Sequence, residues 1–148
     1  MQKKILSMYN EKNLIHIFTI LECCEKAWLY TKGFNNPSDF IWANEQKELN
    51  AVISLFIAIG EESKKIDNEL KNAISFELSW NNIAGLRDKI SHNYRGVDGD
   101  VLWIVIHKDL AKLKNALIDM VHLINIPKEL LQEFLNTPYY KHIQYLGK

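Results

Sequence analysis

The chain has little of what a disulfide-bonded, zinc-binding or membrane-spanning protein needs. Its two cysteines, Cys23 and Cys24, are adjacent, which suits neither a mutual disulfide nor a zinc site. We therefore expect reduced thiols, one in the core and one near it. No apolar run reaches the length of a transmembrane helix, and no hydrophobic signal-peptide segment follows residues 1–4. These absences predict a cytoplasmic protein that makes no contact with a membrane.

An excess of charge of either sign is also missing. The chain has 18 basic and 18 acidic residues, so its formal net charge is zero. Proteins that coat nucleic acid non-specifically are normally basic, so any contact with RNA must be local and brief, as in an enzyme.

The sequence also lacks the common signatures of cofactor and metal sites. No Gly-rich phosphate loop, zinc signature or catalytic-triad motif occurs. Four histidines show no metal-ligand spacing with Asp, Glu or Cys and are expected at the surface or at an interface: His16, His107, His122 and His142. We predict no metal and no cofactor. The four tryptophans are interpreted as core residues: Trp28, Trp42, Trp80 and Trp103.

What the chain does have is helical periodicity. With 148 residues, 47% of them hydrophobic, it suits a single domain over residues 1–148. Apolar residues recur every three or four positions, which predicts helices. The predicted helices span residues 4–31, 38–66, 79–96, 98–125 and 128–136. The fold class is therefore all-α, an antiparallel helical bundle of four main helices plus a short C-terminal helix.

Local signals set the helix limits and the packing faces. Ser38 or Asp39 can cap the second helix, Ser79 the third, and Asp98 or Asp100 the fourth. A seam of seven apolar residues runs along the fourth helix: Leu102, Ile106, Leu110, Leu113, Leu117, Met120 and Ile124. Residues 67–78 suit a loop with a helical turn. The core is expected over about 4–125, and the apolar tail within 127–148 is expected to dock on the same chain or on a partner chain.

The chemistry concentrates in residues 85–96. Asp88 and His92 are four residues apart, so on a helix the carboxylate can orient the imidazole. Arg87 and Tyr94 also share a helix face. Arg87 and His92 diverge by about 140° on a straight helix. For these two to act on one substrate, either the helix ends near His92 or a second chain supplies the missing group.

This stretch resembles a known family. Arg87, four residues, His92, one residue and Tyr94 resemble the R-x4-H-x-Y signature of the HEPN superfamily, in its HepT-type toxin branch. The flanks agree: Trp80 and residues 83–86 before the motif, residues 96–98 and 101–103 after it. The resemblance covers roughly residues 14–124.

The resemblance implies a metal-independent endoribonuclease toxin that cleaves RNA by attack of the 2′-hydroxyl. A small nucleotidyltransferase (MNT) antitoxin would neutralise it by attaching AMP to Tyr94. Arg87 suits phosphate binding because its charge is permanent, and His92 suits proton transfer because it titrates near neutrality. The reaction needs two proton-transferring groups, so one histidine per motif indicates a homodimer that joins two motifs.

Four residues would support the two catalytic ones: Asp88, Ser91, Asn93 and Tyr94. Asp88 stands where the family often has asparagine, and it places a negative charge where RNA phosphates would sit. Two functions that involve no catalysis remain as alternatives. One is a HEPN binding module that docks a nucleotidyltransferase and presents its substrate, which the neutral charge and Asp88 favour. The other is a plain helical dimerisation domain. The intact motif favours the enzyme.

Overall fold

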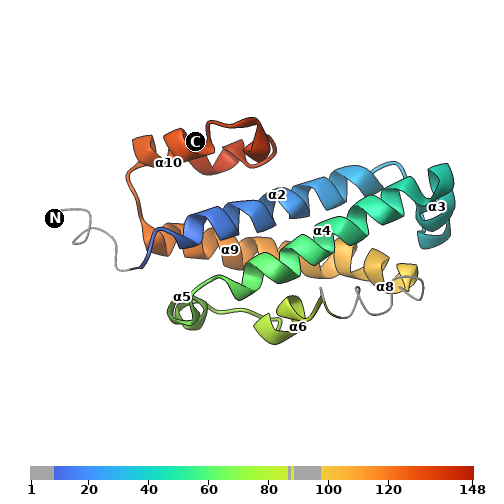
Figure 1. The fold of residues 1–148 in the computed structure, drawn as a ribbon, viewed down its shortest axis with the longest axis horizontal. Helices are drawn as coiled ribbons and strands as arrows, with labels where there is room; N and C mark the ends of the chain where they lie inside the picture. The colour runs from blue at the N-terminus through green and yellow to red at the C-terminus, as the bar shows by residue number, and fades with distance from the viewer. Residues whose placement is uncertain (1–8, 87, 89–97) are drawn as a thin grey trace.

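The fold is an all-α bundle, as predicted. The computed structural model describes residues 9–86, 88 and 98–148, and these residues form helices and turns without any strand. Three long rods lie side by side (Figure 1): α2 (Asn13–Thr31), α4 (Lys47–Lys64) and α9 (Leu110–Ile124). α4 runs antiparallel to α2, and α6 (Trp80–Ala84) and α8 (Gly99–Ile104) lie along one side of the pair.

The predicted apolar stripes form the core. On α4, all five stripe residues are buried: Leu49, Val52, Ile53, Phe56 and Ile59. They face the stripe of α2, in which Leu14, Ile17, Phe18, Leu21 and Cys24 are buried. Removing a side chain of this size from water stabilises the fold by about 1.5–3 kcal/mol each, so the α2–α4 interface is the main source of cohesion.

The first helix starts later than predicted. Residues 9–12 form turns, and α2 begins at Asn13; residues 1–8 lie outside the described part of the chain. Asn13 is buried, and its side chain donates to the Asn10 carbonyl (2.8 Å) and accepts from the Asp67 backbone N–H (2.9 Å). Asparagine side chains compete with helical hydrogen bonding in this way, which accounts for the boundary.

The prediction of one continuous second helix was wrong. It is divided into α3 (Pro37–Trp42), the 3-10 turn η1 (Ala43–Gln46) and α4. Asn44, Glu45 and Gln46 have left-handed backbones, with φ between 49° and 67°. Asn36, rather than Ser38 or Asp39, caps α3 by accepting from the Asp39 N–H (2.9 Å).

A distant contact favours this break. Left-handed residues cost about 1–2 kcal/mol each, and the turn lets Phe40 bury itself against Trp103, with ring centroids 5.8 Å apart. The same turn leaves Trp42 69% exposed, so the prediction that Trp42 is a core residue was also wrong.

The fourth predicted helix is present as one rod with a wider turn inside it. It consists of α8, the π-helical segment η3 (Val105–Asp109) and α9. All seven seam residues are buried. Successive intervals of four residues separate Leu102, Ile106 and Leu110. On a regular α-helix this spacing would move the side chains gradually away from one face, and the extra residue of a π turn brings them back to it. The Trp28 indole N–H donates to the Ile106 carbonyl in this segment (2.8 Å).

The C-terminal segment packs on its own chain. α10 (Lys128–Leu135) agrees with the predicted fifth helix, and the 3-10 turns η4 (Pro138–Tyr140) and η5 (Gln144–Gly147) follow it. Ile143 is fully buried, the Tyr140 ring meets Phe18 edge-on at 5.4 Å, and the buried Glu22 carboxylate accepts the His142 backbone N–H (2.8 Å). The predicted docking of the tail is confirmed on the same chain.

Within the described ranges, no helix combines the length and apolarity that crossing a bilayer requires.

Candidate functional site

The structure describes the residues on both sides of the motif of Arg87, His92 and Tyr94. Five predicted site residues lie outside the described part of the chain: Arg87, Ser91, His92, Asn93 and Tyr94. Asp88 is described, as are residues up to Leu86 and from Asp98 onward. The described part of the candidate site therefore consists of Asp88, the two flanks and the helix beside them.

The entering flank is α6. Ser79 caps it as predicted, accepting from the Asn82 N–H (3.4 Å), and Ile83 on its inner face is buried. Gly85 ends the regular helix, with its N–H bonded to the Asn81 carbonyl (2.9 Å). A Cβ at Gly85 would lie 3.2 Å from that carbonyl oxygen, so the close turn favours glycine. Residues 87 and 89–96 of the predicted third helix lie outside the described part of the chain.

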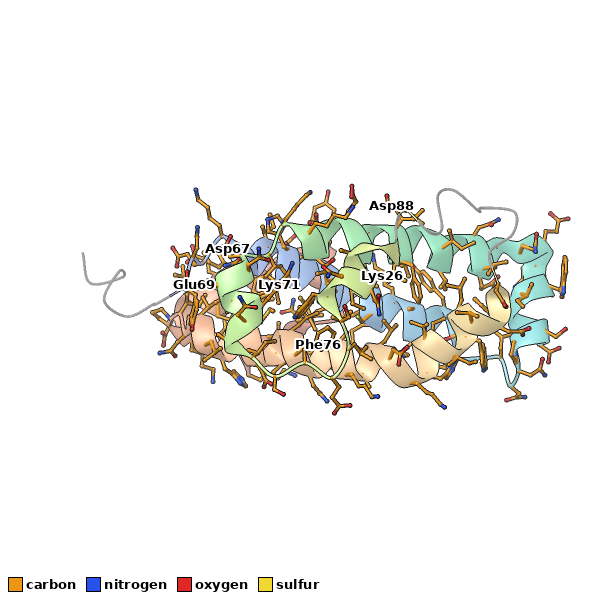
Figure 2. All side chains as sticks on the ribbon, turned by 90° about the horizontal axis from the view of Figure 1, so that it is seen from below. Lys26, Asp67, Glu69, Lys71, Phe76 and Asp88 are labelled. Carbon is orange, nitrogen blue, oxygen red and sulfur yellow. The ribbon has the colours of Figure 1, made fainter. Side chains whose placement is uncertain are left out.

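Asp88 lies next to α4. Its Oδ2 is 4.0 Å from Lys64 Nζ, and both side chains are about half exposed. Figure 2 shows Asp88 at the edge of the face that carries α6. The lysine partly offsets the negative charge that Asp88 brings to the motif. The sequence did not predict this neighbour, because Lys64 comes from another helix.

The leaving flank is the start of α8. Of the two predicted caps, Asp98 is the one used: its Oδ1 accepts from the N–H groups of Asp100 (2.9 Å) and Val101 (3.3 Å). Gly99 is buried against Ile41 of α3, and a Cβ at this position would collide with the Ile41 side chain. The chain thus leaves the motif through a capped and closely packed helix start.

A lysine and two aromatic residues lie close together in the segment that precedes the motif. Phe76 and Trp80 have ring centroids 4.3 Å apart, and Lys71 Nζ lies 5.6 Å from the centre of the Trp80 ring. Burial lowers the pKa of the Lys71 ammonium. Trp80, predicted to be a core residue, packs against the core and is partly exposed. No spacing rule identifies this cluster, because its members come from α5 (Asn68–Ala73), a loop and α6.

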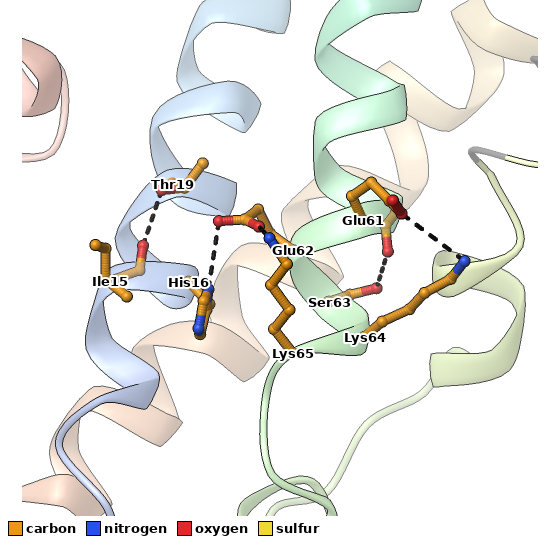
Figure 3. A network of polar contacts seen from close by, with 9 residues as sticks. Ile15, His16, Thr19, Glu61, Glu62, Ser63, Lys64 and Lys65 are labelled. Carbon is orange, nitrogen blue, oxygen red and sulfur yellow. Dashed lines mark hydrogen bonds and ion pairs between the residues drawn. The ribbon is translucent and has the colours of Figure 1, made fainter.

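A polar network joins α4 to α2 (Figure 3). Glu62 lies between Lys65 Nζ, 2.8 Å from its Oε2, and His16 Nδ1, 3.3 Å from its Oε1. Burial raises the pKa of the Glu62 carboxyl, but the hydrogen bonds from Lys65 and His16 outweigh it, and the net pKa lies below its ordinary value. Lys64, on the same turn, also reaches Glu61 at 3.9 Å.

The two cysteines and the possible metal ligands among the described residues are the other candidates for site residues. Cys23 and Cys24 are both buried and free, so both belong to the core. Burial raises the pKa of the Cys23 thiol to about 11 and that of Cys24 further still, which makes both thiols poor nucleophiles. No group of three or more His, Cys, Asp or Glu side chains in the described ranges is placed to hold a metal ion.

Comparison with known proteins places the chain in context. A family described as ribonuclease HepT-like matches residues 20–120. The probable ribonuclease HepT of Thermococcus cleftensis is 41% identical over 70 residues, which cover 47% of this chain and 63% of that protein. A candidate RNase of Methanocaldococcus jannaschii is 31% identical over 98 residues, covering 66% of this chain and 86% of the relative.

A candidate RNase of Caldanaerobacter subterraneus is 29% identical over 102 residues, covering 69% of this chain and 88% of the relative. The aligned part spans less than two thirds of the Thermococcus protein's length. No solved structure matches the chain significantly.

Proposed function

This chain belongs to the HepT-like ribonuclease family, and from that membership we propose that it is a metal-independent endoribonuclease acting as the toxin of a toxin–antitoxin pair. The observation that carries the proposal is the intact motif of Arg87, His92 and Tyr94, which lies within the matched residues 20–120.

The proposed reaction needs only groups that the motif supplies. The 2′-oxygen of the RNA attacks the adjacent phosphorus, a bond to the 5′-oxygen breaks, and a 2′,3′-cyclic phosphate remains. One His92 accepts the proton of the 2′-hydroxyl, and a second, protonated His92 donates to the leaving oxygen. Arg87 binds the non-bridging oxygens, where negative charge accumulates, through two parallel hydrogen bonds. Two histidines require two chains, so the active species is a homodimer with a shared groove.

The ion pair of Asp88 supports catalysis over the non-catalytic alternative. An unbalanced carboxylate beside the motif would repel RNA phosphates. Lys64 lies 4.0 Å from it and offsets part of that charge. The pair is exposed, so the effect on stability is small, but the local potential is closer to neutral than the sequence alone implies.

The proposed partner is a small nucleotidyltransferase that acts as the antitoxin. It would transfer AMP from ATP to the Tyr94 hydroxyl and release pyrophosphate, adding a negative charge and a base-sized obstacle at the groove. In the alternative, a module that presents substrate to the nucleotidyltransferase, the same partner binds but the chain cleaves nothing.

The first prediction tests cleavage. Arg87→Ala and His92→Ala should each lower the rate of RNA cleavage by at least about a hundredfold, because each removes a group that acts in the transition state. The measurement is cleavage of a labelled single-stranded RNA by purified protein, with the product ends identified by mass spectrometry. Products should carry 2′,3′-cyclic phosphate, and EDTA should leave the rate unchanged.

Circular dichroism and thermal melting serve as the fold control, and Lys128→Ala, on the exposed surface of α10, is the matched surface variant. A 3′-hydroxyl product or a rate that depends on added metal would refute the mechanism. Absence of cleavage by the parent protein, with partner binding intact, would leave the module as the function.

A further inference from the structure

Three side chains form a mixed aromatic and cationic surface next to α6. The Phe76 and Trp80 rings have centroids 4.3 Å apart and planes tilted by 38°, and Lys71 Nζ lies 5.6 Å from the Trp80 ring centre. All three residues are partly exposed to solvent. Figure 2 shows Lys71 and Phe76 on the same face of the molecule as Asp88.

Among the described residues, Lys71 has no ion-pair partner. Burial lowers the pKa of its ammonium. Asp67 and Glu69 come from the same end of the bundle but lie on the side of Lys71 away from Phe76 (Figure 2). An ammonium that is partly withdrawn from water gains more from an anion than a fully hydrated one.

The Trp80 ring is held by contacts alone. Its indole nitrogen is buried and meets no acceptor among the described residues. Phe76, Lys71 and the adjoining core therefore hold the ring by packing, without a hydrogen bond from the indole nitrogen to a described residue.

The cluster is also close to the motif along the chain. Trp80 is the first residue of α6, and that helix leads through Gly85 and Leu86 to Arg87. A nucleotide held at Trp80 would belong to the same RNA strand, outside the two nucleotides that flank the cleaved phosphate.

We propose that Lys71, Phe76 and Trp80 form a subsite for one unpaired nucleotide of a single-stranded RNA, with the base on the aromatic pair and its phosphate on Lys71. Bases in a duplex are already stacked on their neighbours, so the subsite selects single strands. The inference rests on the proposed function, because it assigns this nucleotide to the RNA strand that the proposed ribonuclease cleaves.

The experiment compares two substrates. A dinucleotide fills only the cleavage site, whereas a ten-nucleotide strand also reaches the subsite. Phe76→Leu and Lys71→Gln should each raise the KM for the ten-nucleotide strand about tenfold with unchanged kcat, because loss of one stacked base or phosphate contact weakens binding by this order. Cleavage of the dinucleotide should not change.

Matched controls come from the opposite side of the bundle. Phe134→Leu and Lys128→Gln make the same chemical changes on α10, which lies across the molecule from α6 (Figure 1), and should leave both substrates unaffected. Lys71→Gln should also reduce the slope of log affinity against log salt by about 0.7, the value for one phosphate on a single strand.

Binding of a 2′-O-methyl strand, which cannot be cleaved, separates this inference from the proposed function. Fluorescence anisotropy should give weaker binding for Phe76→Leu and Lys71→Gln even if the parent protein cleaves nothing. Equal affinity of the parent and Lys71→Gln proteins, or equal loss on both substrates, would overturn the subsite. Lys71→Gln decides the question if Phe76→Leu lowers the melting temperature.

Discussion

At the scale of single residues, Glu62 is the polar group that joins α2 to the end of α4. It accepts from Lys65 at 2.8 Å and meets His16 at 3.3 Å, and its net pKa is lowered despite burial. A carboxyl whose pKa is lower in the folded state stabilises the fold in its ionised form. This contribution is therefore present above the ordinary pKa of 4.5 and is lost as the pH falls through the folded value.

We predict that Glu62→Gln lowers the free energy of unfolding at pH 7 by about 0.5 kcal/mol, or the melting temperature by about 2 °C. The difference should shrink as the pH falls below 4.5, because the parent carboxyl then becomes protonated too. Thermal melting from pH 3 to 7 measures both. Glu133→Gln, on the exposed side of α10, is the control. A difference that persisted unchanged at pH 3 would mean that charge is not the cause.

The next prediction concerns Tyr94 and the proposed nucleotidyltransferase partner. Incubation with the nucleotidyltransferase, ATP and magnesium should add one AMP to Tyr94 and remove RNase activity without unfolding the chain. Intact mass followed by peptide mapping locates the group. Tyr94→Phe should fold normally and escape neutralisation, apart from any part due to simple binding. A gain of mass at another residue, or none while toxicity is still suppressed, would leave only the docking explanation.

At the scale of helices, Asp98 caps α8, the helix that follows the motif. Asp98→Ala should lower the free energy of unfolding by about 1 kcal/mol, because two N–H groups at the start of α8 lose their acceptor. Asp98→Asn should restore most of this, since asparagine caps as well as aspartate. Urea unfolding gives the values. Equal destabilisation by both variants would show that charge, and not capping, is what counts.

The sequence predicted those elements whose signals are local. The stripe of α4 and the Ser79 and Asp98 caps depend on neighbours within one or two turns, and all were confirmed. The break before α4 was not predicted, because it depends on the contact of Phe40 with Trp103, far along the chain. The π turn could have been recognised from the four-and-four spacing of the seam.

The same distinction holds at the site. The family was identified from the spacing of Arg87 and His92, and the ribonuclease HepT-like match over residues 20–120 confirms it. Lys64 beside Asp88 and Lys71 over Trp80 were missed, because each pair joins residues from different helices. Periodicity along one helix contains no information about such partners.

At the scale of the whole molecule, the C-terminal segment shows how the chain extends the matched domain. The family match ends at residue 120, and residues after α9 fold back over α2. Glu22, buried on α2, accepts the His142 N–H, and Ile143 is fully buried nearby. Part of the side of α2 that α4 does not cover is therefore occupied by the chain's own tail, opposite the face that carries α6 (Figure 1).

The last prediction concerns assembly. If one groove needs a His92 from each chain, purified protein should be dimeric at micromolar concentration by light scattering. Co-expression of equal amounts of parent and His92→Ala chains gives about one quarter parent dimers, one half mixed dimers and one quarter variant dimers. Mixed dimers lack one histidine, so the mixture should retain about a quarter of the parent activity. A chain that acted alone would retain about half, and that value, or a monomer at micromolar concentration, would exclude the shared groove.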